Sequence, residues 1–285
     1  GMGGSQVFLE AGESMSVEDL LKSVIVVSAN DATVALGEHI CGSEAAFISA
    51  MNERAKELGC ENSNFVNTNG LPVENHYSCA YDIALITREL MKHEIVFKYT
   101  GIWMDTIRDG KFGLANTNKL IRFYKGATGM KTGFTGEAKY CLSGTAKRDG
   151  MHLIAVVLGA ETSDKRFAAA KGLLDYGFAN YSILTPEVPS LEPISVTRGV
   201  EASVNIKSDP INILIEKGNN KNIEAQISMN EEIFAPFDAD TEVGYISYLA
   251  EGKEIARAKI LTKNSMEEIS YFSLLIKLFD RLLFK

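Results

Sequence analysis

The strongest constraint on the fold is a pair of extended apolar runs joined by a tight turn. The runs are Tyr140 to Ala146 and Met151 to Leu158, and Lys147-Arg148-Asp149-Gly150 connects them. Asp-Gly is a hairpin signal because both residues adopt positive φ at low cost. The sequence therefore predicts adjacent antiparallel strands in the middle of the chain, and the neighbouring segments must pack around them.

A further run, Gly126 to Leu142, leads into this hairpin and carries Lys131-Thr132-Gly133 at its centre. If it forms an edge strand, Lys131 and Thr132 point to opposite faces, and Gly133 lets a ligand lie close along the backbone. Such an edge can bind an extended acyl substrate. A lone Lys-Thr-Gly occurs often by chance as a solvated loop, so the tripeptide needs a second motif beside it.

The first part of the chain has helical periodicity. Ser16, with Asp19 three residues on, is a typical helix cap, and Ser43 begins a second capped segment that Gly59 closes. We expect a largely helical front part. The expected helices are Val17 to Val27, Asp31 to Cys41, Ala45 to Leu58 and Ala80 to His93.

The pattern changes along the rest of this part. Asn62 to Tyr77 is rich in Asn, Gly and Pro and predicts a long structured loop, and beyond Ile95 we expect short extended pieces. A closing helix is expected from about Asp164 to Tyr176. Helices, then strands, then a helix indicate an α+β layer arrangement over residues 1–183.

A second, smaller domain is expected after a proline-rich linker, Leu184 to Pro193. Alternating runs such as Ile211 to Ile215 and Gly244 to Tyr248 predict a small all-β domain over 184–265. No motif in this domain indicates a catalytic or ligand-binding site.

The last stretch, residues 266–285, has the pattern of an amphipathic helix. Its charges make it a poor spanning helix but a suitable interfacial one, and packing against its own domain is the alternative. Leu274, Leu278 and Phe284 fall outside the apolar face. That face comprises Ile269, Phe272, Leu275, Ile276, Phe279, Leu282 and Leu283.

Charge and cysteine usage exclude several classes of protein. The net charge of −8 and the lack of a basic footprint argue against a nucleic-acid partner, and 46% apolar residues are ample for a packed core. We expect neither a metal site nor a cofactor, because no zinc or disulfide spacing is present. The scattered residues are Cys41, Cys60, Cys79, Cys141, His39, His76, His93 and His152.

A second motif, Ser28-Ala29-Asn30, lies far upstream of Lys131-Thr132-Gly133, and Ser-x-Asn with Lys-Thr-Gly is a paired signature of the penicillin-recognising serine enzymes. The chain resembles the serine-type D-alanyl-D-alanine carboxypeptidases, the low-molecular-mass penicillin-binding proteins. The resemblance implies a β-lactamase-like catalytic domain, a C-terminal β-sandwich and an amphipathic membrane anchor at the outer face of the bacterial cytoplasmic membrane. Further matching motifs are Gly3-Gly4-Ser5-Gln6, Asn67-Thr68-Asn69-Gly70-Leu71 and Tyr176-Gly177-Phe178.

The resemblance also implies a reaction and a role for each matched residue. Such enzymes remove the terminal D-alanine of a peptidoglycan stem peptide through a serine acyl-enzyme, which penicillins trap. Ser28 would relay protons near the leaving group with help from Lys131, and Asn30 would bind the substrate amide. Thr132 and Arg166 would bind the terminal carboxylate. The N–H of Phe134, after Gly133, would donate to the oxyanion.

The sequence departs from the family in one consequential respect. The nucleophile and base belong to a Ser-x-x-Lys motif before Ser28, and no lysine here has a serine three positions before it. The catalytic domain is therefore expected to be N-terminally truncated, without a signal peptide, first strands and central helix, and inactive as given. Smaller departures are Thr128, where the family has aspartate, and Lys139, where it has glycine.

Three accounts of the missing motif compete: a gene start placed at an internal methionine, a deliberately shortened fragment, or a natural non-catalytic relative. The intact Ser28, Asn30, Lys131 and Thr132 favour the first. The third would make the chain an envelope binding or structural protein. A serine β-lactamase is a further alternative, but no motif for a deacylating base is visible. An incomplete catalytic domain exposes apolar surface, so a homo-oligomer is also expected as a candidate.

Overall fold

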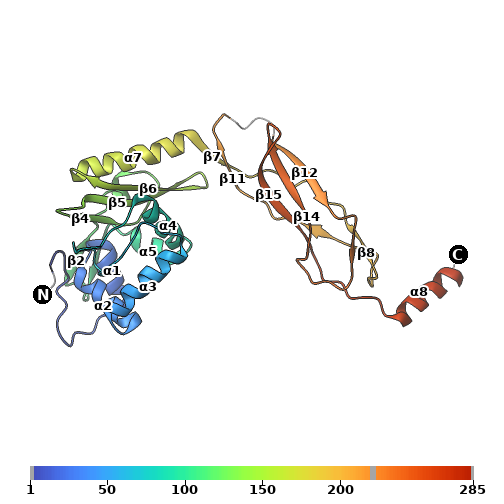
Figure 1. Ribbon diagram of the computed structural model, residues 1–285, viewed down its shortest axis with the longest axis horizontal. Coiled ribbons are helices and arrows are strands. Elements are labelled where there is room, and N and C mark those ends of the chain that lie inside the picture. The colour runs from blue at the N-terminus through green and yellow to red at the C-terminus, as the bar shows by residue number, and fades with distance from the viewer. Residues whose placement is uncertain (1–2, 219–222, 284–285) are drawn as a thin grey trace. The chain divides into compact units, whose positions relative to one another are not determined.

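The structure is a computed structural model that describes residues 3–218 and 223–283. The chain divides into two compact units, Gly1–Ala179 and Asn180–Lys285 (Figure 1). Strand β7 (Tyr181–Leu184) pairs with β11 (Ile213–Glu216) inside the second unit. The domain limits expected from the sequence, 1–183, 184–265 and 266–285, stay predictions.

Helices form the first part of unit 1, and two of them begin at the caps that the sequence predicts. Ser16 Oγ accepts a hydrogen bond from Asp19 N at 3.0 Å, and Ser43 Oγ accepts one from Ala46 N at 3.2 Å. Each cap satisfies an N–H that has no partner within its helix. The helices are α1 (Val17–Val27), α2 (Asn30–Cys41), α3 (Glu44–Glu57) and α4 (Ala80–Leu90).

The expectation of only short extended pieces beyond Ile95 is wrong. Helix α5 (Ile95–Thr100) begins there, because Val96, Tyr99 and Thr100 are buried together on one side of a helical turn. A second short helix, α6 (Leu120–Phe123), buries Leu120. The extended pieces that do form are the hairpin strands β1 (Met104–Ile107) and β2 (Phe112–Ala115).

The central sheet of unit 1 is built around the predicted hairpin. Strand β5 (Lys139–Arg148) pairs with β6 (Met151–Ala160) through a turn in which Asp149 and Gly150 both have positive φ, 48° and 78°. On its other side β5 pairs with β3 (Ala127–Gly129) and β4 (Thr132–Thr135), which follow one another along that edge. Lys-Thr-Gly therefore lies on an edge strand, as expected.

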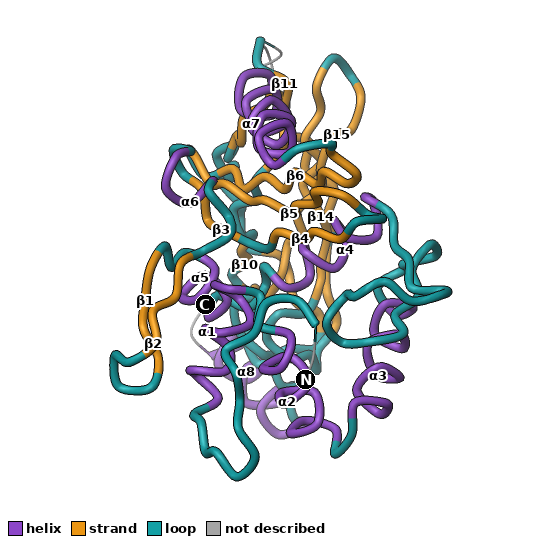
Figure 2. Tube along the Cα trace, turned by 90° about the vertical axis from the view of Figure 1, so that its left-hand side faces the viewer, coloured by secondary structure: helices purple, strands orange, loops and turns teal. Residues whose placement is uncertain are grey.

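Helices cover both faces of this sheet. Figure 2 shows α7 (Ser163–Asn180) on one side of the strands and α1, α4 and α5 on the other. Helix α7 approaches β6 closely at Gly177, where an added Cβ would lie 2.5 Å from Leu153 Cδ1. This helix-sheet-helix arrangement is the predicted α+β layering.

The second unit consists of β-strands around one hydrophobic core, which confirms the small all-β domain. The core draws residues from separate sheets, such as Ile194 and Val196 from β8 and Ile246 and Ile260 from β14 and β15. The sheets have the orders β10-β15-β14-β12, β13-β8-β9 and β11-β7. The further strands are β8 (Ile194–Thr197), β9 (Ser203–Val204), β10 (Ile206–Lys207), β12 (Ile223–Met229), β13 (Glu232–Phe234), β14 (Glu242–Ala250) and β15 (Lys253–Thr262).

The terminal helix begins later than the sequence pattern suggests. Helix α8 spans Tyr271–Leu283, whereas Met266 is 8% exposed in the core of the β structure and its N–H and C=O bond Phe237. The start expected at Met266 is therefore wrong, because burial and strand-like pairing win over the helical pattern there. The side chains of Leu278, Leu282 and Leu283, and residue Phe284, lie outside the described part. No helix in that part is long and apolar enough to cross a membrane.

Candidate active site

Lys131 links the two halves of the broken edge strand. Its N–H donates to Ser143 O at 3.0 Å and its C=O accepts from Ser143 N at 2.9 Å, so the pairing with β5 continues through the break. Its Nζ donates to Thr132 O at 2.9 Å. Burial, and to a lesser extent the charge of Arg166, lowers the pKa of Lys131 from 10.5 to about 8. A lysine in this state can hold or release a proton near neutral pH.

Arg166 lies on the first turn of α7, is 5% exposed and contacts β4 at Gly133. Its Nη1 donates to Gly133 O at 3.3 Å and to Cys141 O at 3.2 Å, and its Nη2 donates to Ser163 Oγ at 3.3 Å. Its Nε is buried and has no hydrogen-bond partner among the described residues. Burial lowers the pKa of this guanidinium. Arg166 thus supports β4 and β5 through backbone carbonyls and adds a buried cation near the half-buried Lys131.

Neither cation has an ion-pair partner among the described residues. The salt bridges there join other lysines and arginines. The charge that affects the pKa of Lys131 is the like charge of Arg166, which lowers it. A half-buried and a buried cation with no counter-ion among the described residues are costly, so the arrangement fits an anionic ligand better than a structural role.

The surface of β4 beyond Lys131 is open. Gly133 is exposed, and a Cβ added to it would meet only Cys141 Cβ, at 3.7 Å, so the face of the sheet is open at this position. Phe134 is 60% exposed, and its ring centroid lies 4.4 Å from that of its cross-strand partner Tyr140. Lys139 stands where the family has glycine. Its φ is 56°, in the left-handed region that glycine adopts without strain, which explains why glycine suits that position.

Ser28 and Asn30 occupy the junction between α1 and α2. Ser28 ends α1 in the left-handed conformation, with φ 64° and ψ 41°. Asn30 begins α2 and is 7% exposed. Its backbone N donates to Ser5 O at 2.8 Å and its Nδ2 donates to Gly3 O at 2.6 Å, so the segment before α1 lies across it. These bonds fix the Asn30 side chain. Its side-chain oxygen, Oδ1, takes no part in them.

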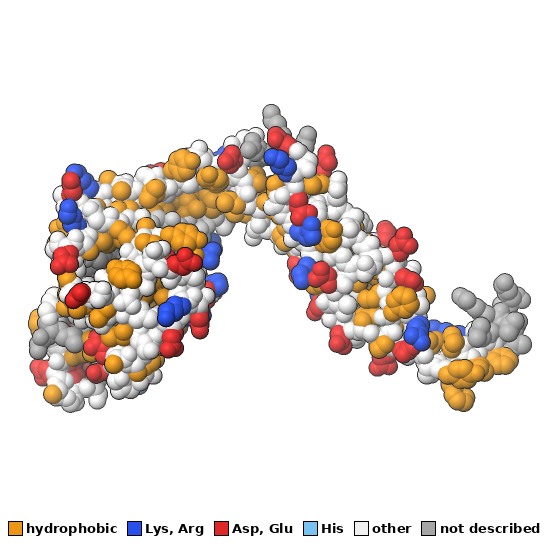
Figure 3. All heavy atoms as spheres, viewed as in Figure 1, with side chains coloured by type: hydrophobic (Ala, Val, Ile, Leu, Met, Phe, Trp, Pro, Cys, Tyr) orange, Lys and Arg blue, Asp and Glu red, His pale blue; other side chains and the backbone are white. Residues whose placement is uncertain are grey.

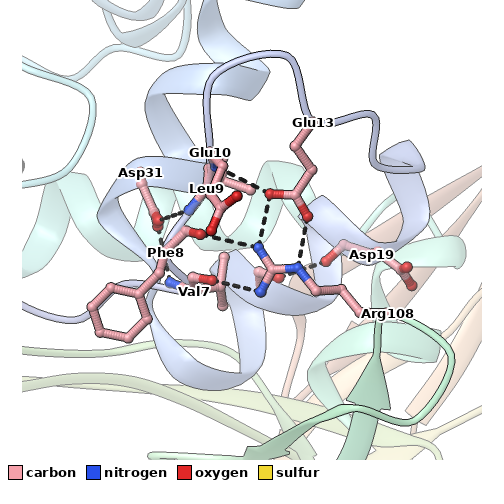
Figure 4. A network of polar contacts seen from close by, with 9 residues as sticks. Val7, Phe8, Leu9, Glu10, Glu13, Asp19, Asp31 and Arg108 are labelled. Atoms are coloured by element: carbon pink, nitrogen blue, oxygen red, sulfur yellow. Dashed lines mark hydrogen bonds and ion pairs between the residues drawn. The ribbon is translucent and has the colours of Figure 1, made fainter.

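The segment that covers Asn30 is anchored by a polar network (Figure 4). Arg108 forms a paired contact with Glu13, at 2.6 and 2.9 Å, and donates to the carbonyls of Val7 and Phe8. Its hydrogen bonds are the main reason that the pKa of Glu13 falls to about 2. Asp31, next to Asn30, accepts from Val7 N. The network therefore holds residues 7–13 against α2.

The described link between the two motifs runs through Thr117, which sequence reasoning missed. Its N–H donates to Val26 O at 3.2 Å near the end of α1, and its Oγ1 lies 2.5 Å from Thr132 Oγ1. The structure thus brings Lys131, Thr132, Gly133, Phe134 and Arg166 together along β4, and Thr117 connects Thr132 to Val26 in α1, two residues before Ser28. The only sequence signal was the Asn116-Thr117-Asn118 pattern of polar residues between apolar runs.

The fold and this strand edge define a class, the penicillin-recognising serine enzymes, and comparison with known proteins narrows it. A family described as D-alanyl-D-alanine carboxypeptidase matches residues 1–162, and one described as penicillin-binding protein 5, C-terminal domain, matches residues 189–268. The chain belongs to the serine-type D-alanyl-D-alanine carboxypeptidase family, and its function is that of a D-alanyl-D-alanine carboxypeptidase.

Two curated relatives show the extent of the similarity. DacF of Bacillus subtilis (strain 168), a D-alanyl-D-alanine carboxypeptidase, is 42% identical over 281 residues, which cover 96% of this chain and 72% of the relative. DacC of Escherichia coli (strain K12), of the same description, is 34% identical and covers 95% of this chain and 68% of the relative.

Solved structures agree with this assignment. Penicillin-binding protein 5 from Haemophilus influenzae has a TM-score of 0.78 at 33% identity, over 93% of this chain and 78% of that one. Penicillin-binding protein D2 from Listeria monocytogenes, in its ampicillin-bound form, has a TM-score of 0.54 at 39% identity, over 57% of this chain and 68% of that one. The neighbours are low-molecular-mass penicillin-binding proteins, which confirms the resemblance and the fold class.

Proposed function

We propose that the edge of β4 binds the terminal D-Ala-D-Ala of a peptidoglycan stem peptide, and that β-lactams occupy the same place. The observation that carries this proposal is a pair of cations, the half-buried Lys131 and the buried Arg166, which have no described counter-ion. A terminal carboxylate supplies the missing negative charge. The open backbone at Gly133 leaves room for an extended peptide to lie along the strand.

Each residue of the candidate site has a role in this proposal. Thr132 donates its hydroxyl to the substrate carboxylate, which Arg166 attracts, and the N–H of Phe134 donates to the oxyanion. Lys131, with its lowered pKa, assists a proton relay through Ser28 to the leaving group. Asn30 presents its carbonyl oxygen to the substrate amide. The nucleophile and its base come from a Ser-x-x-Lys segment that the 285 residues do not contain.

Turnover by the chain joined to such a segment tests these roles. Lys131→Ala should lower kcat/KM for a diacetylated Lys-D-Ala-D-Ala peptide by ~10²-fold or more, because an electrostatic group beside the reacting atoms is lost. Arg166→Ala should act mainly on KM. Lys111→Ala, at an exposed lysine, is the matched control, and circular dichroism monitors folding. Near-parental turnover by the Lys131 variant would show that the site is wrongly placed.

We also propose that α8 attaches the protein to the outer face of the bacterial cytoplasmic membrane. Phe272, Ile276 and Phe279 are 79%, 58% and 56% exposed, and Figure 3 shows hydrophobic side chains gathered on this helix. An exposed apolar face of this kind suits an interfacial helix. Sedimentation with phosphatidylglycerol–phosphatidylethanolamine vesicles should fall sharply for Phe272→Ser with Ile276→Ser. Tyr81→Ser, at an exposed aromatic of unit 1, should leave it unchanged; equal binding by all three proteins would contradict the proposal.

A homo-oligomer of the 285-residue chain is a further proposal. Among the described residues β6 pairs only with β5, and Leu158 at its free edge is 41% exposed. Free strand edges with apolar residues favour association. Light scattering should give a mass above 31.2 kDa. A stable monomer would count against this proposal and would leave the carboxypeptidase assignment untouched.

A further inference from the structure

The segment that carries Thr117 is held rigidly by the two asparagines beside it. Asn118 is fully buried, and its Nδ2 donates to Gly129 O at 2.9 Å at the end of β3. Asn116 is 5% exposed, and its Nδ2 donates to Ile102 O at 2.7 Å. Because buried amides make these bonds in well-defined directions, the backbone between them is fixed. Thr117 is therefore presented from a rigid support.

Thr117 itself is exposed, and its hydroxyl is not needed to hold the segment. Its backbone N–H already bonds Val26 O at 3.2 Å, and the asparagines provide the remaining anchors. The one described contact of its hydroxyl is with Thr132 Oγ1, at 2.5 Å. This contact is short even for hydroxyl pairs, and it joins an exposed residue to the buried hydroxyl of Lys-Thr-Gly. The Thr117 hydroxyl therefore contacts the candidate site directly, through Thr132.

We propose that Thr117 is a positioning residue for carboxylate recognition: its hydroxyl donates to Thr132 Oγ1, so that the O–H of Thr132 is directed at the substrate carboxylate. This inference rests on the proposed function of Thr132. The direction follows from elementary chemistry, because an ionised carboxylate only accepts hydrogen bonds. When it accepts from Thr132, the oxygen of Thr132 is free to accept in turn, and Thr117 is the donor in place.

The arrangement also strengthens the bond to the ligand. In a chain of hydrogen bonds each member polarises the next, so a Thr132 hydroxyl that accepts from Thr117 becomes a better donor. Without Thr117, the hydroxyl of Thr132 would lose its one described partner and would have to be oriented on binding. A residue outside Lys-Thr-Gly thus sets how well the strand edge distinguishes a free carboxylate from a neutral chain end.

The test compares two ligands on the 285-residue chain, acetyl-D-Ala-D-Ala and its C-terminal amide, by NMR titration of the Gly133 and Phe134 amides. Thr117→Val is nearly isosteric and removes only the hydroxyl, and Thr117→Ser retains it. Loss of one hydrogen bond should weaken binding of the free acid roughly 3- to 10-fold in the valine variant. Binding of the amide should change less than about 2-fold. The serine variant should bind like the parent.

The matched control is Thr128→Val, which breaks a similar hydroxyl pair, Thr128 with Thr145 at 2.7 Å, one residue before Gly129. It should leave the ratio of the two affinities unchanged. Equal ratios for Thr117→Val and the parent would overturn the positioning role, and so would equal weakening of acid and amide, which marks a merely structural effect. Thr132→Val separates the underlying proposal: if that variant binds the acid like the parent, or the parent does not bind it at all, the assigned role of Thr132 fails and the role of Thr117 fails with it.

Discussion

At the scale of single residues, the unusual feature of this protein is Lys131, the half-buried lysine of the candidate site. Most lysines keep their charge in water, whereas among the described residues the Nζ of Lys131 donates only to the backbone oxygen of Thr132. Desolvation therefore destabilises the charged form of Lys131, and the pKa of this lysine falls to about 8. Under the proposed function, a bound carboxylate would offset this cost in stability.

The first prediction follows from that cost. Lys131→Met keeps the length of the side chain and removes the charge, so the free energy of unfolding at pH 7 should rise by about 1–3 kcal/mol. Between pH 8 and 10.5 the unfolded chain holds more protons on this residue than the folded chain. Stability of the parent should therefore increase relative to the variant across this window, and the difference should shrink towards pH 10.5.

Urea unfolding at pH 7 and pH 10.5, with Lys111→Met as the exposed control, measures both effects. The control should show neither the gain at pH 7 nor the change with pH. A Lys131→Met variant that is less stable than the parent at pH 7 would mean that the lysine is paired with a negative group in the folded protein.

At the scale of elements, the break between β3 and β4 is what delivers Lys131 to the site. Gly129 has φ 115°, and Met130, 4% exposed, has φ 72°, so the strand kinks here before pairing resumes at Lys131. The kink lets the buried amide of Asn118 bond the carbonyl of Gly129. A straight strand would place Lys131 in a different register and direction.

The second prediction concerns this kink. A Cβ at Gly129 would lie 2.3 Å from Thr100 O, and its φ is one that L side chains rarely adopt. Gly129→Ala should therefore destabilise unit 1 by roughly 3 kcal/mol or more, through steric overlap and backbone strain together. Gly136→Ala, where an added Cβ meets nothing within 4 Å, is the control. Thermal unfolding followed by circular dichroism should show a large drop for the first variant and little change for the second; similar midpoints would contradict the described kink.

At the scale of the whole molecule, the third prediction separates fold from chemistry. The 285 residues contain both Ser28-Ala29-Asn30 and Lys131-Thr132-Gly133 but no serine three positions before a lysine. A serine without a base to accept its proton is a weak nucleophile at neutral pH. The polypeptide of these residues should therefore form no covalent adduct with excess benzylpenicillin, as measured by intact-protein mass spectrometry. An adduct that maps to Ser28 would refute this, and the chain joined to a Ser-x-x-Lys segment is the positive control.

Much of the architecture could be predicted from the sequence because it depends on local chemistry. The caps at Ser16 and Ser43 and the Asp149-Gly150 turn act within a few residues, so the elements they begin or connect form where expected. The extended run from Gly126 to Leu142 suggested an edge strand at Lys131-Thr132-Gly133, and this stretch does pair with β5 alone among the described strands. The periodicity signal failed at Ile95, where six residues are too few for a pattern, and at Met266, where burial in the β core decides the conformation.

Residue type and spacing were enough to predict the enzyme family and to nominate candidate site residues, because each motif is a short contiguous stretch of the chain. Only the tertiary structure decided that Arg166 binds the carbonyls of β4 and β5, that Gly3 holds the amide of Asn30, and that Thr117 meets Thr132. The physical reason is that each of these contacts joins residues that are 15 to 33 positions apart. Their directions depend on backbone kinks and burial that arise only when the sheet and its helices pack together.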